Sequence, residues 1–499
     1  MVDQILTSVS KFQPEVVLTS AFLIAIILGT VIPRRTSLLG FFALFSLGAA
    51  CYYLMQQAGA VPASIFSNMY ALDMFSIFFK TVILAAGLLV VSFSMLSREL
   101  KEGAKNLGEY YALLMAMVLG MFLMVGASNL LMMYLAMELT SLTSYILAGY
   151  TKHALDSSEA SLKYVIYGAV ASGMMLYGIS ILYGLTGATD IYTVNRALAA
   201  GEVNDVALTI AGILIVVGFG YKITVVPFHF WSPDVYEGAP ITITAILAVA
   251  SKAAGFAMLI RFFTVAFVDP VLSGSGGGHW ASFSGFQWNY ILAAISVLTM
   301  TLGNLVAIWQ NNLKRLLAYS SIAHAGYMLM GLVVLSSAGI TAVLIYFVVY
   351  LFMNLGAFYV VMLMANKTGS EDIETYKGLG YRSPLIAVVM AIFLISLTGL
   401  PPTAGFIGKL YLFAALIDAK WIWLAIVGAL NSVVSLYYYV RIFRNMFLRD
   451  PDGSTASIRF APIQVFLMLA LAIPTVLLGL YFGPLVQLAQ SSATLLNVR

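Results

Sequence analysis

Apolar runs of about twenty residues recur along the whole 499-residue chain, separated by short segments that contain charged, proline or glycine residues. A run of about twenty apolar residues is long enough to cross the hydrocarbon core of a bilayer as an α-helix. Only 9% of the residues are charged and 61% are hydrophobic, whereas soluble domains carry about 25% charged residues. The chain therefore cannot cover a globular surface with polar groups, and we predict an all-α, polytopic integral membrane protein.

The breaks between the runs predict fourteen transmembrane helices in a single membrane domain, residues 1–499. They are expected at residues 14–33, 37–58, 70–96, 109–126, 129–150, 158–186, 206–231, 240–267, 288–309, 315–336, 338–366, 384–417, 420–448 and 459–490. Residues 1–108 would hold the first three helices, 109–267 and 288–448 two five-helix repeats, and 459–490 the last helix. Because each repeat has an odd number of helices, the two repeats would insert with opposite orientation.

Basic residues are divided unevenly between the loops on the two sides of the predicted bundle. One side holds fifteen: Arg34, Arg35, Arg98, Lys101, Lys105, Lys152, Lys314, Arg315, Lys367, Lys377, Arg382, Arg441, Arg444, Arg449 and Arg459. The other side holds five: Lys11, Arg196, Arg261, Lys420 and Arg499. Since basic loops stay in the cytoplasm, both termini are expected on the non-cytoplasmic side of the inner membrane or another energy-converting membrane.

Several classes of function are disfavoured by the composition. The single cysteine, Cys51, allows neither an intramolecular disulfide nor a CxxC redox site. No His, Cys or carboxylate group has the spacing of metal ligands, so we expect no metal or cofactor in this chain. The loops lack a basic stripe for nucleic acid, and the Gly/Ser-rich run from Ser273 to Gly278 lacks the lysine of a phosphate-binding loop, which favours a flexible connector.

Five lysines lie inside the predicted helices, together with Glu138: Lys80, Lys163, Lys222, Lys252 and Lys409. An unpaired charge at the bilayer centre costs about 2.5 to 3.5 kcal/mol or more, so these groups must face one another, water or the bundle interior. A buried lysine is suited to taking up and releasing a proton. A series of such groups along one chain is better explained as a proton relay than as separate structural ties.

Some of these residues also have a structural interpretation. Lys80 could extend to the membrane surface, and Lys163 follows Glu159 by four residues, the spacing of a helical ion pair. His324 and His229 could each pass protons near neutral pH, and each could equally be a hydrogen-bonded core histidine.

Two predicted helices contain helix breakers beside a charge. Pro227 follows Lys222 by five residues, and Pro401 and Pro402 precede Lys409. Proline opens a helix in the membrane, which is tolerated only where the gap faces protein or a wet cavity. Broken helices in two halves are typical of an inverted-repeat transporter, although the two lysines lie on opposite sides of their prolines.

Four segments resemble one family closely: Glu159-Ala-Ser-Leu-Lys163-Tyr164, Pro227 to Pro240, Lys314 to Ser321, and Gly399 to Lys409. They are similar to the antiporter-like subunit N (subunit 2) of NADH-quinone oxidoreductase, respiratory complex I, and its photosynthetic relatives. The segment from Trp231 to Pro240 is the most specific, because it resembles subunit N rather than the sister subunits L and M or the related cation/proton antiporters.

The resemblance implies a proton-translocating subunit of a complex I-like NAD(P)H or ferredoxin:quinone oxidoreductase, without redox chemistry of its own. It implies that Glu138 pairs with Lys163 and that Lys409 lies on the exit side of the relay. The relay residues would be Glu138, Lys163, Lys222, Lys252, Lys409 and His324. Iron–sulfur clusters, flavin and quinone would lie on partner subunits, and the direct partners would be other membrane subunits and lipids. The alternative function is a secondary cation/proton antiporter.

Overall fold

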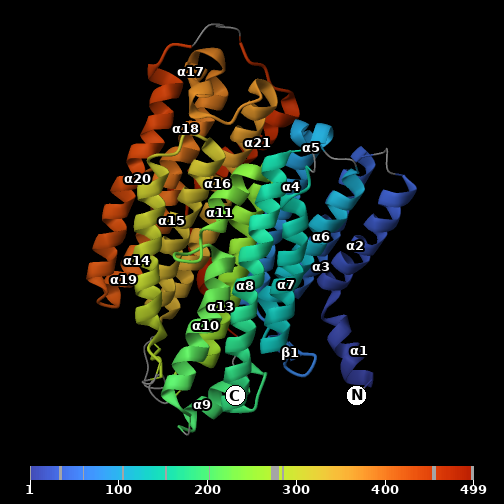
Figure 1. The fold of residues 1–499 in the computed structure, drawn as a ribbon, viewed down its shortest axis with the longest axis vertical. Helices are drawn as coiled ribbons and strands as arrows, with labels where there is room; N and C mark the ends of the chain where they lie inside the picture. Colours follow the sequence, from blue (N-terminus) through green and yellow to red (C-terminus); the bar gives the residue numbers. More distant parts are fainter. Residues whose placement is uncertain are drawn as a thin grey trace.

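A computed structural model describes residues 2–32, 36–59, 61–103, 106–151, 154–201, 203–270, 280–283, 286–451 and 457–495. In these residues the chain forms one helical bundle whose long helices run along the longest axis of the molecule (Figure 1). Some predicted loop residues lie outside the described residues: Arg34, Arg35, Lys105, Lys152, His153, Ser273 to Gly278, His279 and Arg499.

Thirteen helical segments of the described residues are long and apolar enough to cross a membrane. They are α2 (Gln13–Val31), α3 (Thr36–Gln57), α4 (Met74–Leu96), α6 (Leu107–Gly126), α7 (Leu130–Ala148), α8 (Leu155–Thr186), α10 (Asp205–Ile223), the continuous segment Ile241–Ala266, α14 (Trp288–Ala307), α15 (Leu313–Val333), α16 (Ser337–Thr368), α20 (Ile422–Leu448) and α21 (Pro462–Leu480). The remaining predicted span, residues 384–417, is present as two short helices, α18 (Pro384–Thr398) and α19 (Ala404–Asp418). The predicted all-helical architecture is therefore confirmed.

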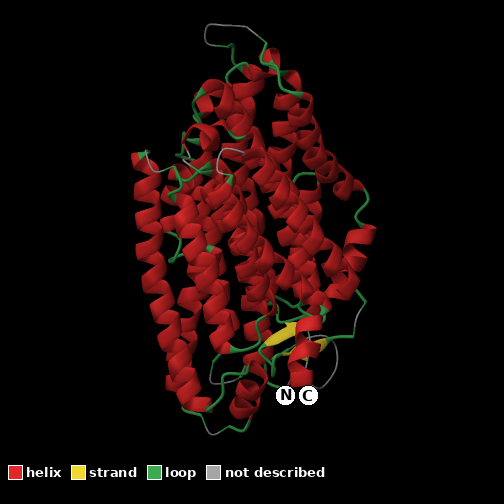
Figure 2. Cartoon of the chain, turned by 90° about the vertical axis from the view of Figure 1, so that its right-hand side faces the viewer, coloured by secondary structure: helices red, strands yellow, loops and turns green. Residues whose placement is uncertain are grey.

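Short elements cover the two ends of the bundle. They are α1 (Val2–Ser10), β1 (Ala63–Ile65), β2 (Tyr70–Leu72), α5 (Arg98–Gly103), α9 (Ile191–Ala199), η3 (Ile373–Tyr376), α17 (Leu379–Arg382) and α22 (Gly483–Ser492). Both termini, α9 and the antiparallel β1–β2 hairpin lie at one end, called here the terminal end (Figures 1 and 2). Helices α5 and α17 lie at the opposite end (Figure 1).

Two predicted helix boundaries are wrong. The third span was expected from residue 70, but residues 70–72 form β2, and α4 begins only after Asp73, whose carboxylate accepts a hydrogen bond from the Ser76 N–H at 2.8 Å. Capping by an aspartate fixes this start. The last predicted span, 459–490, is divided into α21 and α22 after Leu480.

The two predicted helix breaks are present. Thr224 follows α10 and Gly399 follows α18 as C-terminal caps, and both residues adopt the left-handed conformation, with φ of 61° and 89°. Each break contains a cis proline peptide, Val226–Pro227 in the first and Pro401–Pro402 in the second. After the breaks the chain continues as α11 (Trp231–Gly238) and as α19.

The segment Ile241–Ala266 contains an irregularity that the sequence pattern does not predict. It begins as α12 (Ile241–Ile246), passes through the π-helical turn η1 (Leu247–Ser251), and continues as α13 (Lys252–Ala266). Such π-turns inside α-helices are frequently found at functional sites. Here the π-turn ends directly before Lys252.

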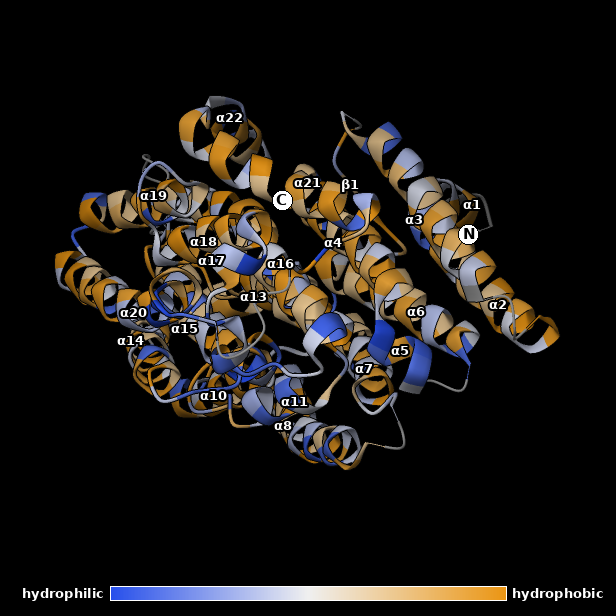
Figure 3. Ribbon diagram, turned by 90° about the horizontal axis from the view of Figure 1, so that it is seen from above, coloured by the Kyte–Doolittle hydropathy of each residue, from blue (hydrophilic) through white to orange (hydrophobic). Residues whose placement is uncertain are grey.

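The outside of the bundle is apolar. Seen from above, hydrophobic residues cover the outer helices such as α2, α3 and α20, whereas hydrophilic residues gather around α5 and α11 (Figure 3). Large apolar side chains such as Phe45, Val31 and Val433 are at least two-thirds exposed. Exposed apolar side chains of this kind suit contact with lipid or with apolar partner helices.

Candidate functional site

Lys222 lies at the C-terminal end of α10, two residues before the first helix break, and is buried. Its ammonium donates a hydrogen bond to Ser141 Oγ on α7 at 3.2 Å. Glu138, about one turn earlier on α7, acts electrostatically on the same ammonium. Its buried Oε1 has no hydrogen-bond partner among the described residues. The helix break thus brings Lys222 to the Glu138 side of α7.

Lys163 lies elsewhere. Its ammonium is 2.5 Å from Asp234 Oδ2 on α11 and 2.7 Å from Glu159 Oε1. Tyr145, seven residues and about 10 Å beyond Glu138 along α7, packs edge-on against Tyr164, so Lys163 is level with the end of α7 rather than with Glu138. The implied pairing of Lys163 with Glu138 is therefore corrected, and the helical ion pair with Glu159 is confirmed.

Lys252 is completely buried at the start of α13. Its ammonium donates to the backbone oxygen of Ser321 at 2.7 Å and to Ser321 Oγ at 2.5 Å. Tyr350 O–H donates to the same Ser321 Oγ at 2.8 Å, and Asn354 donates to Tyr350 Oη at 2.7 Å. This lysine is therefore held by neutral groups of α15 and α16.

His324 lies in α15, three residues after Ser321, and is buried. Its Nδ1 is 2.7 Å from Tyr346 Oη, and its Nε2 is 3.5 Å from Tyr439 Oη. Lys252 and Lys409 both act electrostatically on the imidazole. Ser321, which binds Lys252, is one turn away on the same helix, and the His324 ring packs against Tyr327, whose ring lies under the Lys409 ammonium. His324 thus lies between the two lysines, and its hydroxyl partners fit both the structural and the proton-carrying interpretation.

Lys409 lies on α19, after the second break, and is buried. Its ammonium donates to Thr398 O, in the last residue of α18, at 2.7 Å and to Ser432 Oγ on α20 at 3.0 Å. It also lies over the Tyr327 ring, 4.5 Å from the centroid. A cation at this place is stabilised by the negative end of the α18 helix dipole.

Gly255 on α13 packs against the Lys222 side chain, so the lysine contacts lie on adjoining helices, from α7 and α10 through α13 and α15 to α19 and α20. Within the described part of the chain, Lys222, Lys252 and Lys409 make no ion pair within 4.0 Å, and their partners there are hydroxyl and carbonyl groups. His229, at the first break, is buried, and its Nδ1 has no hydrogen-bond partner among the described groups.

A second group of buried charges lies outside this series. Lys80 on α4 is fully buried, 2.6 Å from Glu15 Oε1 on α2, and Tyr70 O–H donates to the same oxygen at 2.7 Å. The Lys80 ammonium also lies over the Tyr70 and Phe122 rings. The interpretation that Lys80 extends to the membrane surface is therefore wrong.

Arg261 was expected in a loop, but it is fully buried within α13. Its guanidinium binds Asp73 through two hydrogen bonds, of 2.8 and 2.9 Å. Sequence reasoning missed both acidic partners, Glu15 and Asp73. The available signal was their position at the beginning of long apolar runs.

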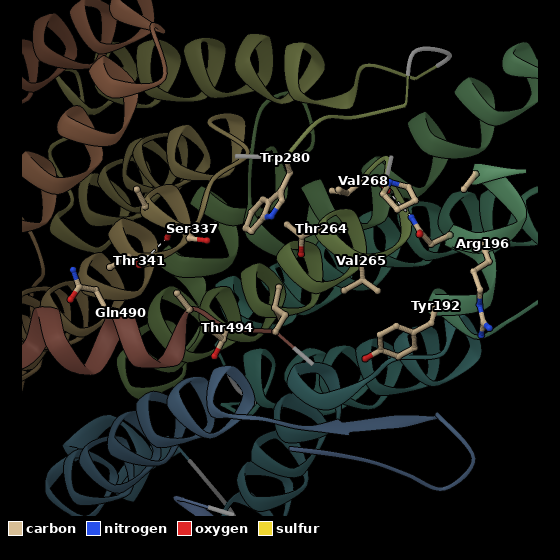
Figure 4. A pocket seen from close by; sticks show the side chains of 16 residues that line it. Tyr192, Arg196, Thr264, Val265, Val268, Trp280, Ser337, Thr341, Gln490 and Thr494 are labelled. Atoms are coloured by element: carbon tan, nitrogen blue, oxygen red, sulfur yellow. Dashed lines mark hydrogen bonds between the residues drawn. The ribbon is translucent and has the colours of Figure 1, made fainter. Parts of the chain in front are cut away.

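A cavity of about 880 Å³ lies at the terminal end, between α9, α13, α16 and α22. Tyr192, Thr264, Trp280 and Gln490 line it from different elements (Figure 4). None of the buried lysines lines it. Among the described residues, no group of three or more His, Cys, Asp and Glu residues could hold a metal ion.

Comparison with known proteins agrees with this arrangement. Residues 127–435 match the sequence model of the family described as NADH:quinone oxidoreductase/Mrp antiporter, transmembrane. NADH-quinone oxidoreductase subunit N 2 of Chloroherpeton thalassium is 49% identical, over 100% of this chain and 97% of that protein. Subunit N of Chlorobium chlorochromatii is 46% identical, over 99% of this chain and 96% of that protein.

Solved structures share the fold. A chain of respiratory complex I from Thermus thermophilus with bound aureothin has a TM-score of 0.79 and 31% identity, covering 96% of this chain and 99% of that one. A chain of the Mrp complex from Dietzia sp. has a TM-score of 0.83 at 22% identity, covering 97% of each chain, which shows the fold alone. The chain therefore belongs to the family of antiporter-like N subunits of NADH-quinone oxidoreductases.

Proposed function

We propose that this chain is the proton-translocating, non-redox membrane subunit of a complex I-like NAD(P)H or ferredoxin:quinone oxidoreductase. Quinone reduction on partner subunits, which carry the iron–sulfur clusters and flavin, drives proton movement through this chain. Its direct partners are other antiporter-like and small membrane subunits. The relay residues are Glu138, Lys163, Lys222, Lys252, His324 and Lys409.

One observation carries the proposal: Lys222, Lys252 and Lys409 are buried on hydroxyl and carbonyl partners rather than on carboxylates. Burying an ammonium group without a counter-ion costs free energy, and this cost is removed when the lysine transfers its proton to a neighbouring group. His324 lies between Lys252 and Lys409 with hydroxyls on both ring nitrogens. Imidazole and hydroxyl groups both donate and accept, as a proton relay requires.

The distribution of basic residues supports the orientation of the chain. Lys314 and Arg261 are buried in helices rather than exposed in loops, which leaves fourteen basic residues on one side and four on the other from the original fifteen and five. The bias is unchanged. The terminal end accordingly faces the non-cytoplasmic side.

The proposal is tested with Lys222→Ala in the purified complex, reconstituted into vesicles. We expect fewer protons translocated per quinone reduced, with the subunit composition and the quinone reduction rate retained. Lys101→Ala, on the exposed helix α5, is the control and should leave the ratio unchanged. An unchanged ratio in Lys222→Ala would refute the relay.

The shared fold with the Mrp complex favours one alternative, a secondary cation/proton antiporter. Purification of the tagged chain in mild detergent separates the two functions. Recovery with iron–sulfur and quinone-binding subunits supports the redox-driven pump. Recovery only with other antiporter-like chains, together with cation-dependent proton flux, supports the antiporter.

A further inference from the structure

The segment from Trp231 to Pro240 contains α11, and the relay uses none of its residues. Trp231 fixes the position of this short helix. Its ring stacks on Tyr164, with centroids 4.2 Å apart and planes at 12°, and its indole N–H donates to the backbone oxygen of Tyr221 at 3.2 Å. These contacts hold α11 against α8 and α10. They therefore fix which side chains of α11 face outward and which face inward.

The outer face of α11 is charged and reaches water. Arg315 Nη1 on α15 lies 2.6 Å from Asp234 Oδ1 and 2.8 Å from Glu237 Oε2. The side chains of Asp234 and Glu237 are 30% and 41% exposed. Protons of the aqueous phase therefore have access to this face of the helix.

The inner face of α11 carries two hydroxyl groups. Ser232 and Tyr236 are four residues apart and so lie on one face of the helix. Both are fully buried, and neither hydroxyl oxygen has a hydrogen-bond partner among the described groups of the protein. Leaving such a group unsatisfied costs about 1 to 3 kcal/mol. Buried polar groups without protein partners are commonly satisfied by internal water.

These hydroxyls lie beside the residue that holds Lys252. The hydroxyls of Ser232 and Ser321 both act on the Tyr236 hydroxyl, but neither meets the distance and angle of a hydrogen bond to it. Ser321 Oγ already accepts hydrogen bonds from Lys252 and from Tyr350. A serine hydroxyl has two acceptor positions and one donor, so Ser321 can still donate its own hydrogen to a third group.

We propose that Ser232, Tyr236 and Ser321 enclose an internal water site that delivers protons to Lys252 from the charged outer face of α11. This inference rests on the proposed relay and adds an input branch to it. When Lys252 is neutral, the Ser321 O–H turns to donate to its amine. A proton arriving on the water then passes to Ser321 Oγ while the original hydrogen of Ser321 moves to that amine. Two protons move in each exchange, the net result is one proton transferred from the water to Lys252, and no bond between heavy atoms changes.

Tyr236→Phe in the intact reconstituted complex tests the branch, because it removes one hydroxyl and keeps the ring. We expect fewer protons translocated per quinone reduced. Tyr359→Phe is the matched control: Tyr359 is also buried, on α16, and its hydroxyl donates to the backbone oxygen of Gln464 at 3.2 Å, away from Lys252. An unchanged ratio in Tyr236→Phe would overturn the inference.

A second variant and a direct structural observation test the same water site even if Tyr236→Phe fails to fold or assemble. Ser232→Ala should lower the same ratio, and it carries the test if Tyr236→Phe does not assemble. A high-resolution structure of the complex should contain an ordered water within hydrogen-bond distance of Tyr236 Oη. A dry site would also overturn the inference.

Lys252→Met distinguishes failure of this branch from failure of the relay. If Lys252→Met translocates protons at the normal ratio, the relay itself is refuted. If Lys252→Met lowers the ratio and Tyr236→Phe does not, only the input branch is refuted.

Discussion

The Lys163 ammonium lies 2.5 Å from Asp234 Oδ2, and the other oxygen of the same carboxylate lies 2.6 Å from Arg315 Nη1. Asp234 is thus shared between a cation of α8 and a cation of α15. Glu159 and Glu237 complete an alternating chain of five charges. This chain connects the first and the second predicted repeat through α11.

Asp234→Asn should loosen the connection between α8 and α11. Half-exposed ion pairs are worth about 0.2 to 1 kcal/mol each, so we expect a small loss of thermal stability and a clearer loss of proton translocation per quinone reduced. Glu237→Gln is the control, because Glu237 binds the same Arg315 Nη1 without contacting Lys163. Equal effects of the two variants on translocation would contradict a specific role of the Asp234–Lys163 pair.

The sequence predicted the spans and both helix breaks because these depend on local patterns. Runs of apolar residues define the helices, and Pro227 and Pro401 mark the breaks. The ion pairs could not be predicted in the same way. Lys163 and Asp234 are 71 residues apart and Asp73 and Arg261 are 188 residues apart, so their pairing depends on helix packing that no local pattern encodes.

The buried Lys80–Glu15 pair should matter for stability. Lys80→Met leaves Glu15 buried without its cation, and removing one partner of a buried pair costs about 3 to 5 kcal/mol. We expect a strong fall in the thermal unfolding temperature of the purified complex or in assembly. Lys163→Met, which breaks half-exposed pairs, should cost much less. If both variants lowered the unfolding temperature or assembly equally, burial of the Lys80–Glu15 pair would not account for its contribution to stability.

The double variant Lys80→Met with Glu15→Leu gives a second test of the same pair. It removes both charges, so no uncompensated carboxylate stays buried. The unfolding temperature should recover toward that of the wild type. If the double variant were as unstable as Lys80→Met, the loss would come from packing rather than charge.

The second helix break depends on Gly405. A Cβ at this position would lie 1.7 Å from the backbone oxygen of Ser396, so Gly405→Ala must push α18 and α19 apart. Overpacking of this kind costs about 1 to 3 kcal/mol or more. Gly173→Ala is the control, because a Cβ at Gly173 on α8 meets nothing within 4 Å. We expect poor assembly of the complex in Gly405→Ala and normal assembly in Gly173→Ala, measured as the amount of complex recovered from the membrane.

Glu138→Gln should reduce proton translocation without disturbing the fold. The substitution keeps the shape of the side chain but removes the negative charge that acts on Lys222. A smaller fraction of Lys222 would then be protonated before each transfer. Glu159→Gln is the matched control for a glutamate near the same end of the relay, since Glu159 pairs with Lys163. Protons translocated per quinone reduced should fall more in Glu138→Gln than in Glu159→Gln, at equal complex content. Full translocation in Glu138→Gln would remove Glu138 from the relay and leave Ser141 as the contact that positions Lys222.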